Sequence, residues 1–461
     1  MNPRRSQNLA AARAGSVLII VLWVAFGLVS LAIYFANSMS LELRSADNRV
    51  AALEADQAIE AAARYVSNVL ARAISQQQTG TLPDPQTYRC EAVPVGDATF
   101  WLIGRETNAW QNGPDRLTFG LVDEASRLNL NTASVDMLQA LPNMTADLAA
   151  NIVAWRQSTN DSSAGGAQSE TYVRQQPPYL CKNAPFETVA ELRLVYGMNL
   201  AILYGEDSNL NGMLDPNEND GDVLPPFDNR DSRLDPGLFE YVTVYSRQPT
   251  TLTNINNRQQ LGSLLAGALE TERANQILQR AFGGGGGAAG GPGGSGGGGG
   301  AAGGFNSVLQ FYFRSGMTAD ELAKIEGSIT ASTNVQGLVN VNTAAEAVLA
   351  CIPGVGFEKA PALVAYRQTN PNNLSSIAWV TQVLDRNSAL LAGPYITTRS
   401  YQFAADVAAL GHYGRGYRRV RFVFDTTEGT PRIVFRQDLT HLGWALGRQG
   451  RNAPLLARQS R

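Results

Sequence analysis

The chain has 461 residues, which is enough for two or three domains with a sizeable core. Its formal net charge is only −3, so composition alone does not indicate a nucleic-acid-binding protein. The two histidines, His412 and His441, are expected as surface or packing residues beside turns. No Ser-His-Asp arrangement, zinc spacing, nucleotide loop or paired carboxylate in an apolar frame can be recognised, so we expect no enzyme.

An uncharged run extends from Ala14 to Leu41, and Arg4, Arg5 and Arg13 precede it. Its apolar part, residues 17–35, is long enough to cross a hydrocarbon core of about 30 Å as a helix. A cleavable secretory signal would need a shorter apolar core and a small-residue cleavage site beyond it. This run shows no such end. Because arginines without acids precede the span, we expect the N-terminus in the cytoplasm and the bulk of the chain outside it.

The helical pattern continues beyond the apolar run. No proline occurs between the run and Pro83, and apolar residues recur at a spacing near 3.6 among charged ones. We therefore expect one helix from about Ser16 to Ala73, whose second half lies on a soluble domain. Two runs rich in aromatic and β-branched residues follow, Ala98–Ile103 and Arg116–Val122, and both are typical of strands.

The soluble part contains an internal repeat. The sequence Asn-Leu-Asn-Thr-Ala at 129–133 recurs as Asn-Val-Asn-Thr-Ala at 340–344. The same offset pairs Leu138 with Leu349, Pro142 with Pro353, Ile152 with Leu363, Trp155 with Tyr366 and Arg156 with Arg367. Each copy has the pattern of two helices joined by a turn and opened by an Asn-Thr cap, with a further helix at 186–194 or 375–384. The sequence thus predicts two small helical modules.

The remaining segments predict a mixed architecture. We expect a strand at 239–246, a helical stretch ending near Arg280, and a flexible insertion of glycine and alanine at 283–304. Period-two alternation predicts three C-terminal strands at 400–410, 418–424 and 432–439. Arginines on these strands are expected on a solvated face. We expect an α+β fold, in which the long N-terminal helix packs on an antiparallel sheet whose strands flank a large inserted α-helical domain.

An acidic loop carries the clearest site pattern. Oxygen-bearing side chains occupy positions 1, 3, 5, 9 and 12 of a twelve-residue stretch, with Gly212 at position 6 and the carbonyl of Met213 at position 7. The five side chains are those of Asp207, Asn209, Asn211, Asp215 and Glu218. This is the EF-hand loop pattern, in which alternate hard oxygens converge on Ca²⁺. The alternative is a solvated acidic loop. Because Pro216 is unusual there and no strong helix pattern precedes the loop, we expect a structural calcium site and no sensor.

The turn of the second module matches another motif. Pro353-Gly354-Val355-Gly356 resembles the hairpin of helix-hairpin-helix or SAM-like repeats, whose backbone amides can hold a nucleic-acid phosphate. A glycine pair at such a place more often simply closes a tight turn. A membrane-anchored DNA-binding receptor that uses Gly354 and Gly356 is therefore the alternative function, and a generic anchored, calcium-stabilised periplasmic module is a third.

Three cysteines occur in the chain. Cys351 lies in an apolar helical context that is typical of a small buried residue. Cys90 and Cys181 lie in polar, proline-flanked loops, where an oxidising compartment would permit a disulfide. Connectivity does not follow from sequence, so a Cys90–Cys181 bridge and two free thiols both remain open.

Taken together, these features resemble a family, the minor pseudopilins of bacterial type II secretion systems, and among them the K class, general secretion pathway protein K. The resemblance rests on Arg13-Ala-Gly15 before the apolar run, on the long helix, on both repeat copies and on the C-terminal strands. It implies that a prepilin peptidase cuts after Gly15 and that Ser16 becomes an N-methylated mature N-terminus. Most pilin-like proteins carry Glu as the fifth mature residue. Here that residue is Ile20, and the K class likewise lacks the acid.

The resemblance also implies a domain order, which we place on this sequence. We expect a leader (1–15), a transmembrane segment (16–36), a pilin-like α/β domain (37–124 and 390–445), an inserted helical domain (125–389) and a tail (446–461). Within the inserted domain we expect repeats at 125–200 and 336–389 and the calcium loop at 205–220. Calcium sites occur in the family.

The implied function is structural. The family forms the pseudopilus tip, initiates assembly and supports export of folded periplasmic proteins. The implied partners are minor pseudopilins of the I, J and H classes, the major pseudopilin, prepilin peptidase, the inner-membrane assembly platform and secreted substrates, with nucleic acid not expected. The implied location is the bacterial inner membrane, crossed once, with the C-terminal domain in the periplasm until assembly moves it to the tip.

Overall fold

The computed structural model describes residues 8–76, 79–105, 117–157, 165–283, 304–331 and 337–447, and for residues 8–16 only the backbone. Most of the expected flexible insertion and of the tail, and part of the expected leader, lie outside these residues. The first helix, α1, runs from Asn8 to Ser75, which confirms a single long helix over the expected range. Among the described residues, it is the one helix that is long and apolar enough to cross a membrane, and its apolar window is not buried.

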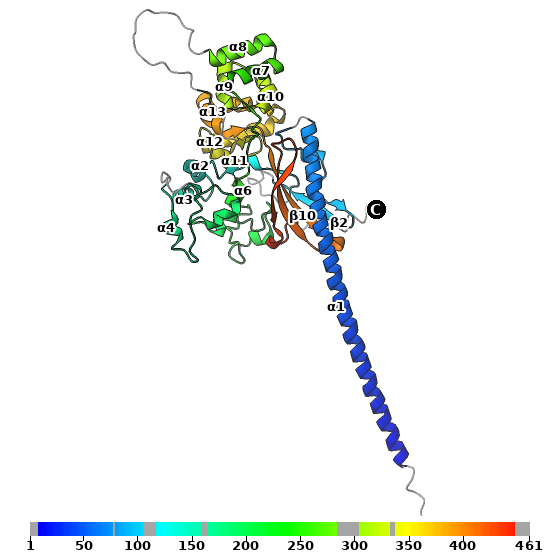
Figure 1. The fold of residues 1–461 in the computed structure, drawn as a ribbon. Helices are drawn as coiled ribbons and strands as arrows, with labels where there is room; N and C mark the ends of the chain where they lie inside the picture. Colours follow the sequence, from blue (N-terminus) through cyan, green and yellow to red (C-terminus); the bar gives the residue numbers. More distant parts are fainter. Residues whose placement is uncertain are drawn as a thin grey trace, which may run out of the picture.

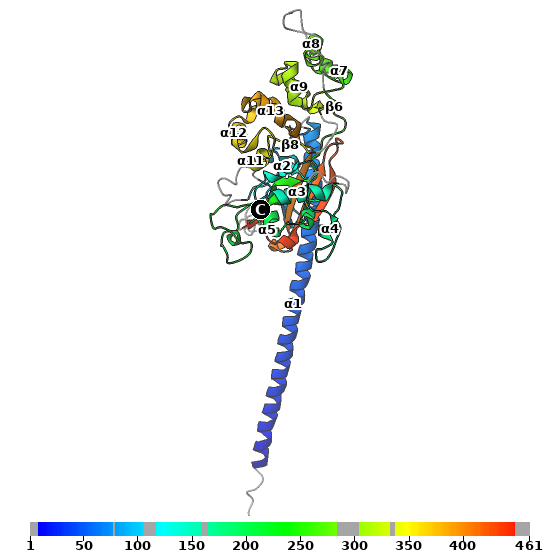
Figure 2. The same ribbon diagram turned by 90° about the vertical axis from the view of Figure 1, so that its left-hand side faces the viewer.

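The second half of α1 packs on the protein through a stripe of buried apolar side chains, most of them alanines. They recur at helical spacing as Ala51, Ala55, Ala58, Ile59, Ala62, Ala63, Val66 and Leu70, all buried. Because alanine adds little volume, the helix axis lies close to the surface beneath it. Figure 1 shows α1 leaving the globular part as a long rod, and Figure 2 shows the same arrangement after a 90° turn.

The surface beneath α1 is an antiparallel sheet of six strands. Its strands are β1 (Val93–Val95), β2 (Ala98–Ile103), β3 (Val122–Asp123), β10 (Gln402–Leu410), β11 (Arg418–Asp425) and β12 (Arg432–Asp438). The order is β1-β2-β10-β11-β12, and β3 also pairs with β10. The expected strand at 98–103 and the three C-terminal strands are confirmed. The arrangement fits the expected pilin-like α+β fold.

The two faces of the sheet differ in chemistry. Side chains such as Phe100, Val407 and Phe422 point to α1 and form one apolar cluster with it. Alternate positions point to the other face, and these include the charged Asp406 and Arg419. Because successive side chains on a strand alternate between faces, the apolar face binds the helix and the charged face receives the helical part of the chain.

The helical part lies in the chain between β3 and β10 and contains three similar modules. Each module opens on a short strand, continues through small helices and closes on a second strand parallel to the first. Module 1 comprises β4 (Leu128–Asn129), α2 (Val135–Gln139), α3 (Ala146–Arg156), α4 (Ser169–Tyr172), η4 (Val189–Leu194), α5 (Leu200–Tyr204), α6 (Leu238–Tyr241) and β5 (Val242–Thr243). Module 2 comprises β6 (Thr253–Asn254), α7 (Arg258–Ala268), α8 (Thr271–Phe282), α9 (Val308–Ser315), α10 (Ala319–Ile325), η6 (Glu326–Ser328) and β7 (Ile329–Thr330). Module 3 comprises β8 (Val339–Asn340), α11 (Glu346–Ala350), α12 (Gly356–Thr369), η7 (Pro371–Asn373), η8 (Ile377–Gln382), α13 (Arg386–Ala392), η9 (Gly393–Tyr395) and β9 (Ile396–Thr397).

The same hydrogen bonds recur in modules 1 and 3. Asn129 Nδ2 donates to Ser246 Oγ at 3.0 Å, and Asn340 Nδ2 donates to Ser400 Oγ at 2.7 Å. At the end of the second helix, the guanidinium of Arg156 donates to the carbonyl of Leu130, as Arg367 does to Val341. The duplicated sequence therefore builds equivalent contacts. The assignment of the modules to a helix-hairpin-helix or SAM-like class stays a prediction.

Module 2 was not expected from the sequence. Its entry strand carries Asn254-Ile255-Asn256, where the other modules have Asn-Leu-Asn and Asn-Val-Asn. Asn256 exchanges two hydrogen bonds with the backbone of Phe305, at 2.9 and 2.6 Å, just as Asn131 does with Phe186, at 2.9 and 2.7 Å. In Figures 1 and 2, α7 and α8 of this module lie at the end of the molecule away from the N-terminal end of α1.

Two expected strands are wrong in extent. Of the described residues 117–122, only Val122 belongs to a strand, and Phe119 makes an isolated bridge to Ile103. Of 239–246, the first residues form helix α6 and only Val242 and Thr243 form a strand, because they pair with β4 alone. The helices expected at 186–194 and 375–384 are shorter 3₁₀ helices, η4 and η8.

Candidate calcium loop and the buried ionic network around it

The acidic loop follows α5 and closes on the short helix η5 (Pro216–Glu218). Asp207 opens it, and its two carboxylate oxygens accept hydrogen bonds from the amides of Asn211 and Gly212, each at 2.9 Å. Gly212 has a φ of +72°, and a Cβ there would meet the side chain of Arg105 at 3.1 Å. The positive φ therefore favours glycine at this turn, and a Cβ would also crowd the side chain of Arg105.

The other expected ligands form hydrogen bonds within the loop. Asp215 Oδ2 accepts hydrogen bonds from Nδ2 of Asn209 at 2.6 Å and from Nδ2 of Asn211 at 2.9 Å. Glu218 reaches back across the loop to accept from the amides of Ser208 and Asp215, both at 3.0 Å. The side chains of positions 3, 5 and 9 thus meet at one carboxylate, and the glutamate at position 12 spans the loop.

Burial sets the electrostatics of the loop. Glu218 is 1% exposed, and its burial together with the nearby charge of Asp207 raises the pKa of its carboxyl to about 8. Burial also raises the pKa of Asp207, and the charge of Arg105 opposes that rise. Buried carboxylates in such a place are costly unless a cation or hydrogen bonds compensate them.

The oxygen donors of the loop are of the kind that calcium binds, and the backbone turn at Gly212 is in place. Three carboxylates, two amide oxygens and the carbonyl of Met213 provide the hard oxygens that Ca²⁺ takes. Within the described residues, however, no three acidic, histidine or cysteine side chains already converge closely enough to hold a metal ion. Asn209 and Asn211 present their amide nitrogens to Asp215. Ligation therefore requires both amides to turn their oxygens inward.

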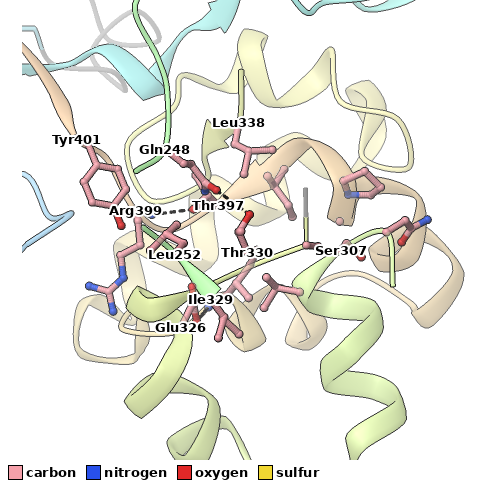
Figure 3. A pocket seen from close by; sticks show the side chains of 17 residues that line it. Gln248, Leu252, Ser307, Glu326, Ile329, Thr330, Leu338, Thr397, Arg399 and Tyr401 are labelled. Carbon is pink, nitrogen blue, oxygen red and sulfur yellow. Dashed lines mark hydrogen bonds between the residues drawn. The ribbon is translucent and has the colours of Figure 1, made fainter. Parts of the chain in front are cut away.

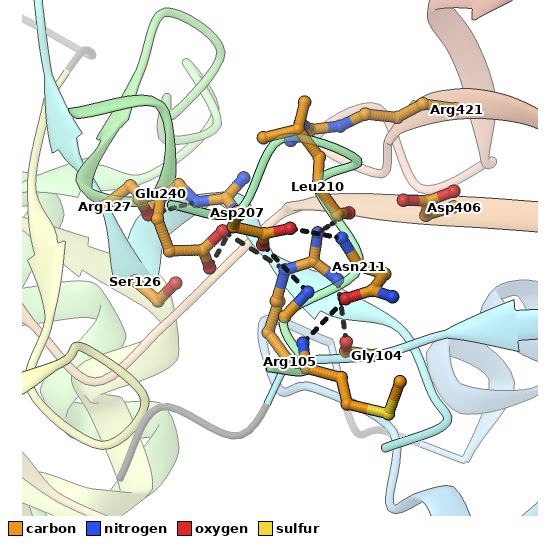
Figure 4. A network of polar contacts seen from close by, with 12 residues as sticks. Gly104, Arg105, Ser126, Arg127, Asp207, Leu210, Asn211, Glu240, Asp406 and Arg421 are labelled. Carbon is orange, nitrogen blue, oxygen red and sulfur yellow. Dashed lines mark hydrogen bonds and ion pairs between the residues drawn. The ribbon is translucent and has the colours of Figure 1, made fainter. Parts of the chain in front are cut away.

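A buried ion pair connects the sheet to this loop. Arg419 of β11 is fully buried and pairs with Asp406 of β10, through Nε to Oδ1 at 2.8 Å and Nη2 to Oδ2 at 2.6 Å. The same guanidinium donates to the carbonyls of Asn209 and Leu210. Arg105, which follows β2, also donates to the carbonyl of Leu210 (Figure 4).

The network continues into module 1. Glu240 accepts from Arg105 at 3.1 Å and from Arg127 at 3.2 Å. Glu124 pairs with Arg127 at 3.4 Å and with Arg421 of β11 at 2.7 Å. Burial alone would raise the pKa of both glutamates, but the arginine charges hold each pKa below its ordinary value. Alternating charges thus join the sheet, module 1 and the loop.

The expectation of a solvated arginine face is wrong for this part of the sheet. Arg419 is buried and the side chain of Arg421 is only 12% exposed, because the helical part covers this face of the sheet. Arg419 pairs with Asp406, and Arg421 pairs with Glu124. Only on the edge strand β12 are Arg432 and Arg436 exposed, as expected. Sequence reasoning missed Arg105, Glu240, Asp406 and Arg419 as neighbours of the loop. The alternation of arginines with Val420 and Phe422 indicates that the strand has one charged and one apolar face. It does not reveal which part of the chain covers the charged face.

The expected processing residues lie at the start of α1. Gly15 and Ser16 belong to the helix, whose side chains are described only from Val17 onward. Ile20 is 61% exposed, as are its apolar neighbours to about the same extent. Residues 17–35 therefore present an apolar surface on all sides, which is typical of a membrane-spanning helix.

The sequence left open whether Cys90 and Cys181 form a disulfide or are two free thiols, and in the structure both thiols are free. Cys90 packs at the margin of the cluster between α1 and the sheet, whereas Cys181 is buried in the core of the modules. Cys181 Sγ lies 3.8 Å from the carbonyl oxygens of Ala154 and Trp155. The two cysteines belong to different cores, so their loops are not neighbours. Cys351 is buried, as expected.

The glycine hairpin of module 3 uses its amides internally. Gly354 and Gly356 both have positive φ, as a tight turn requires. The amides of Val355 and Gly356 donate to the carbonyl of Ile352 at 3.0 and 3.3 Å. Lys359, the nearest cation in sequence, pairs with Asp385 at 2.8 Å. This conformation therefore favours a turn-closing role for the glycines over phosphate binding.

A cavity of about 40 Å³ lies between modules 2 and 3. Among the residues lining it are Glu326, Thr330 and Arg399 (Figure 3). Glu326 is buried, which raises its pKa, and its carboxylate accepts a hydrogen bond from the amide of Ile377 at 2.8 Å and another from Thr398. The cavity has room for a few water molecules, and we assign it to the joint between the modules.

The long N-terminal helix on an antiparallel sheet, with a helical insertion, fits a pilin-like α+β fold. Within that insertion, residues 124–204, which span most of module 1, match the family model of type II secretion system (T2SS) protein K. The match confirms the resemblance to K-class minor pseudopilins that the sequence indicated.

One solved structure that the chain resembles is the crystal structure of the GspK-GspI-GspJ complex from the enterotoxigenic Escherichia coli type 2 secretion system. The similarity covers 86% of this chain and 99% of the other, with 12% identity and a TM-score of 0.40. No curated protein matches the chain.

Proposed function

We propose that the protein is a structural component of a type II secretion pseudopilus, not an enzyme, and that it helps export folded periplasmic proteins. The observation that carries this proposal is the division of α1 into an exposed apolar half and a half packed on the sheet through alanines. Such a helix serves as an inner-membrane anchor before assembly and as a packing spine afterwards. The N-terminus would lie in the cytoplasm and the folded part in the periplasm.

A place at the tip is supported by the residue at position 20. In hydrocarbon, an acidic side chain is costly unless a partner amine from a neighbouring subunit compensates it. Ile20 has no such requirement, which suits the subunit that has no other subunit ahead of it and that initiates assembly. The proposed partners are therefore minor pseudopilins of the I, J and H classes and the major pseudopilin. Prepilin peptidase, which would cut after Gly15, the inner-membrane assembly platform and secreted substrates complete the set.

The acidic loop is proposed as a structural calcium site. Asp207, Asn209, Asn211, Asp215 and Glu218 would contribute side-chain oxygens, and Met213 would contribute its carbonyl. The support is the EF-hand spacing of these residues, the meeting of Asn209 and Asn211 at the Asp215 carboxylate, and the positive φ of Gly212 at the turn. A bound ion would supply positive charge to carboxylates that are otherwise buried among each other.

Export from the native bacterium tests the main proposal. Deletion of the gene is expected to leave the folded exoproteins in the periplasm, and the intact chain supplied in trans is expected to restore their export. Ile20→Leu should restore export as well, whereas Ile20→Glu places a charge in the membrane span and should restore it less. Unchanged export after deletion would refute a role in secretion.

A further inference from the structure

The backbone of the acidic loop is held from outside by the pilin-like part of the protein. Arg419 of β11 donates through Nη2 to the carbonyl of Leu210 at 2.5 Å and through Nη1 to the carbonyl of Asn209. Arg105, beyond the end of β2, donates to the same Leu210 carbonyl. Leu210 has a φ of +54°, an uncommon conformation for a side chain branched at Cγ, and these bonds help to hold it.

The arginines bind oxygens that the proposed cation does not use. Loop positions 3 and 4 offer their carbonyls to the arginines, whereas the ion would take side-chain oxygens and the carbonyl of Met213 at position 7. The arginine charges are also balanced, since Asp406 pairs with Arg419 and Glu240 pairs with Arg105. The two arginines can therefore support the loop backbone without occupying the proposed ion site and without strongly repelling an ion bound there.

We propose that Arg419 is a positioning residue for cation binding. It holds the loop backbone in the conformation that binds the ion, and it links ion binding by the loop to the stability of strand β11. This inference rests on the calcium binding proposed above. Because binding and folding are linked, an ion that prefers the ordered loop also stabilises the strand that orders it. The loop belongs to the helical part and the strand to the sheet, so the ion would fix one against the other.

Calcium titration of the full chain in detergent, followed by calorimetry, tests the inference. In Arg419→Lys, one ammonium replaces a guanidinium that reaches a carboxylate and two carbonyls at once, so calcium affinity should fall by about tenfold or more. Arg421→Lys is the matched control. Arg421 lies on the same strand and face and is also buried in an ion pair, but it pairs with Glu124. Its calcium affinity should stay within about twofold of the original.

Two further measurements keep the test decisive if Arg419→Lys does not fold. Arg105→Lys removes the other support of the Leu210 carbonyl and should also weaken binding. In the unaltered chain, hydrogen exchange in peptides that cover Arg418–Asp425 should slow when calcium is added. Equal affinities for Arg419→Lys and the original chain would overturn the inference, as would equal weakening by Arg419→Lys and Arg421→Lys. No calcium binding by the original chain would overturn the calcium proposal as well, and the secretion proposal would stand.

Discussion

Nδ1 of His412 lies 2.7 Å from Oε2 of Glu54, so the connection between β10 and β11 is held against the spine helix. Nε2 of the same ring lies 2.9 Å from Asp47, which also pairs with Arg415. The backbone amide of His412 donates to Glu54 at 2.9 Å. The histidine lies beside a turn, as the sequence indicated, and its bonds to these two acids link α1 to the sheet.

This contact predicts a dependence of stability on pH. The hydrogen bonds to Asp47 and Glu54 raise the pKa of His412 above its ordinary 6.5, so its contribution is complete below 6.5 and is lost as pH rises through the raised value. Bonds from His412 lower the pKa of Glu54 below its ordinary 4.5, so its contribution is present above 4.5 and is lost as pH falls through the lowered value. The stabilisation is therefore greatest between these two ordinary values.

Thermal melts of the chain in detergent, with and without His412→Gln, measure this contribution. The difference in melting temperature should be largest near the middle of that pH range and should shrink in alkaline solution. Since the groups are partly exposed, the effect should correspond to less than about 1 kcal/mol. A difference that is constant with pH would mean that His412 acts only by packing.

Gly411 is predicted to be required for the fit of the sheet against α1. A Cβ at this position would lie 2.1 Å from the carbonyl oxygen of Ala51. Its φ is not positive, so Gly411→Ala adds steric conflict without backbone strain and should cost about 1–3 kcal/mol of unfolding free energy. Gly267→Ala is the control, because a Cβ there meets nothing within 4 Å and should be neutral or slightly stabilising. Denaturant unfolding measures both, and equal stabilities would contradict the close approach.

The similarity of modules 1 and 2 predicts equivalent roles for two asparagines. Asn131→Ala and Asn256→Ala each remove a side chain that satisfies both backbone groups of a distant residue, Phe186 or Phe305. Each variant should lose about 2 kcal/mol. Asn373→Ala, at an exposed position of η7, should change stability by less than about 0.5 kcal/mol. If only Asn131→Ala is destabilising, the correspondence between the modules is one of shape and not of energetics.

Chelation is predicted to lower thermal stability if the acidic loop holds calcium. A ligand at about 100 times its Kd stabilises the folded state by about 2.7 kcal/mol, which removal of the ion would abolish. Asp207→Ala and Glu218→Gln should each reduce the difference between melts in calcium and in chelator. Asp231→Asn, an exposed acid outside the loop, should leave it unchanged. A melting temperature that is insensitive to chelator in the unaltered chain would argue against a structural ion.

Much of the pilin-like part could be predicted from the sequence, because its signals are local. The uncharged run, the absence of proline before Pro83 and the alternation in β10 to β12 each reflect one element and one buried face. The duplicated Asn-x-Asn-Thr-Ala pattern located modules 1 and 3. Module 2 was missed because Asn254-Ile255-Asn256 is followed by Asn and Arg instead of Thr-Ala, and because the glycine-rich stretch interrupts its helices.

The surroundings of the acidic loop could not be predicted, because they are made by residues far apart in sequence. Arg419 meets Leu210 across more than two hundred residues, and Glu240 meets Arg105 across 135 residues. The ligand pattern itself is local and therefore readable. In contrast, the free Cys90 and Cys181 show that similar loop composition does not bring two residues together.

The central claim is that the uncharged run is a pseudopilin anchor, and the mass of the mature N-terminus tests it most directly. The full chain, purified from membranes of its own bacterium, should begin at Ser16 with an N-methyl group, and Gly15→Val should retain the leader. A chain that still begins at residue 1, with no loss of export, would contradict the claim.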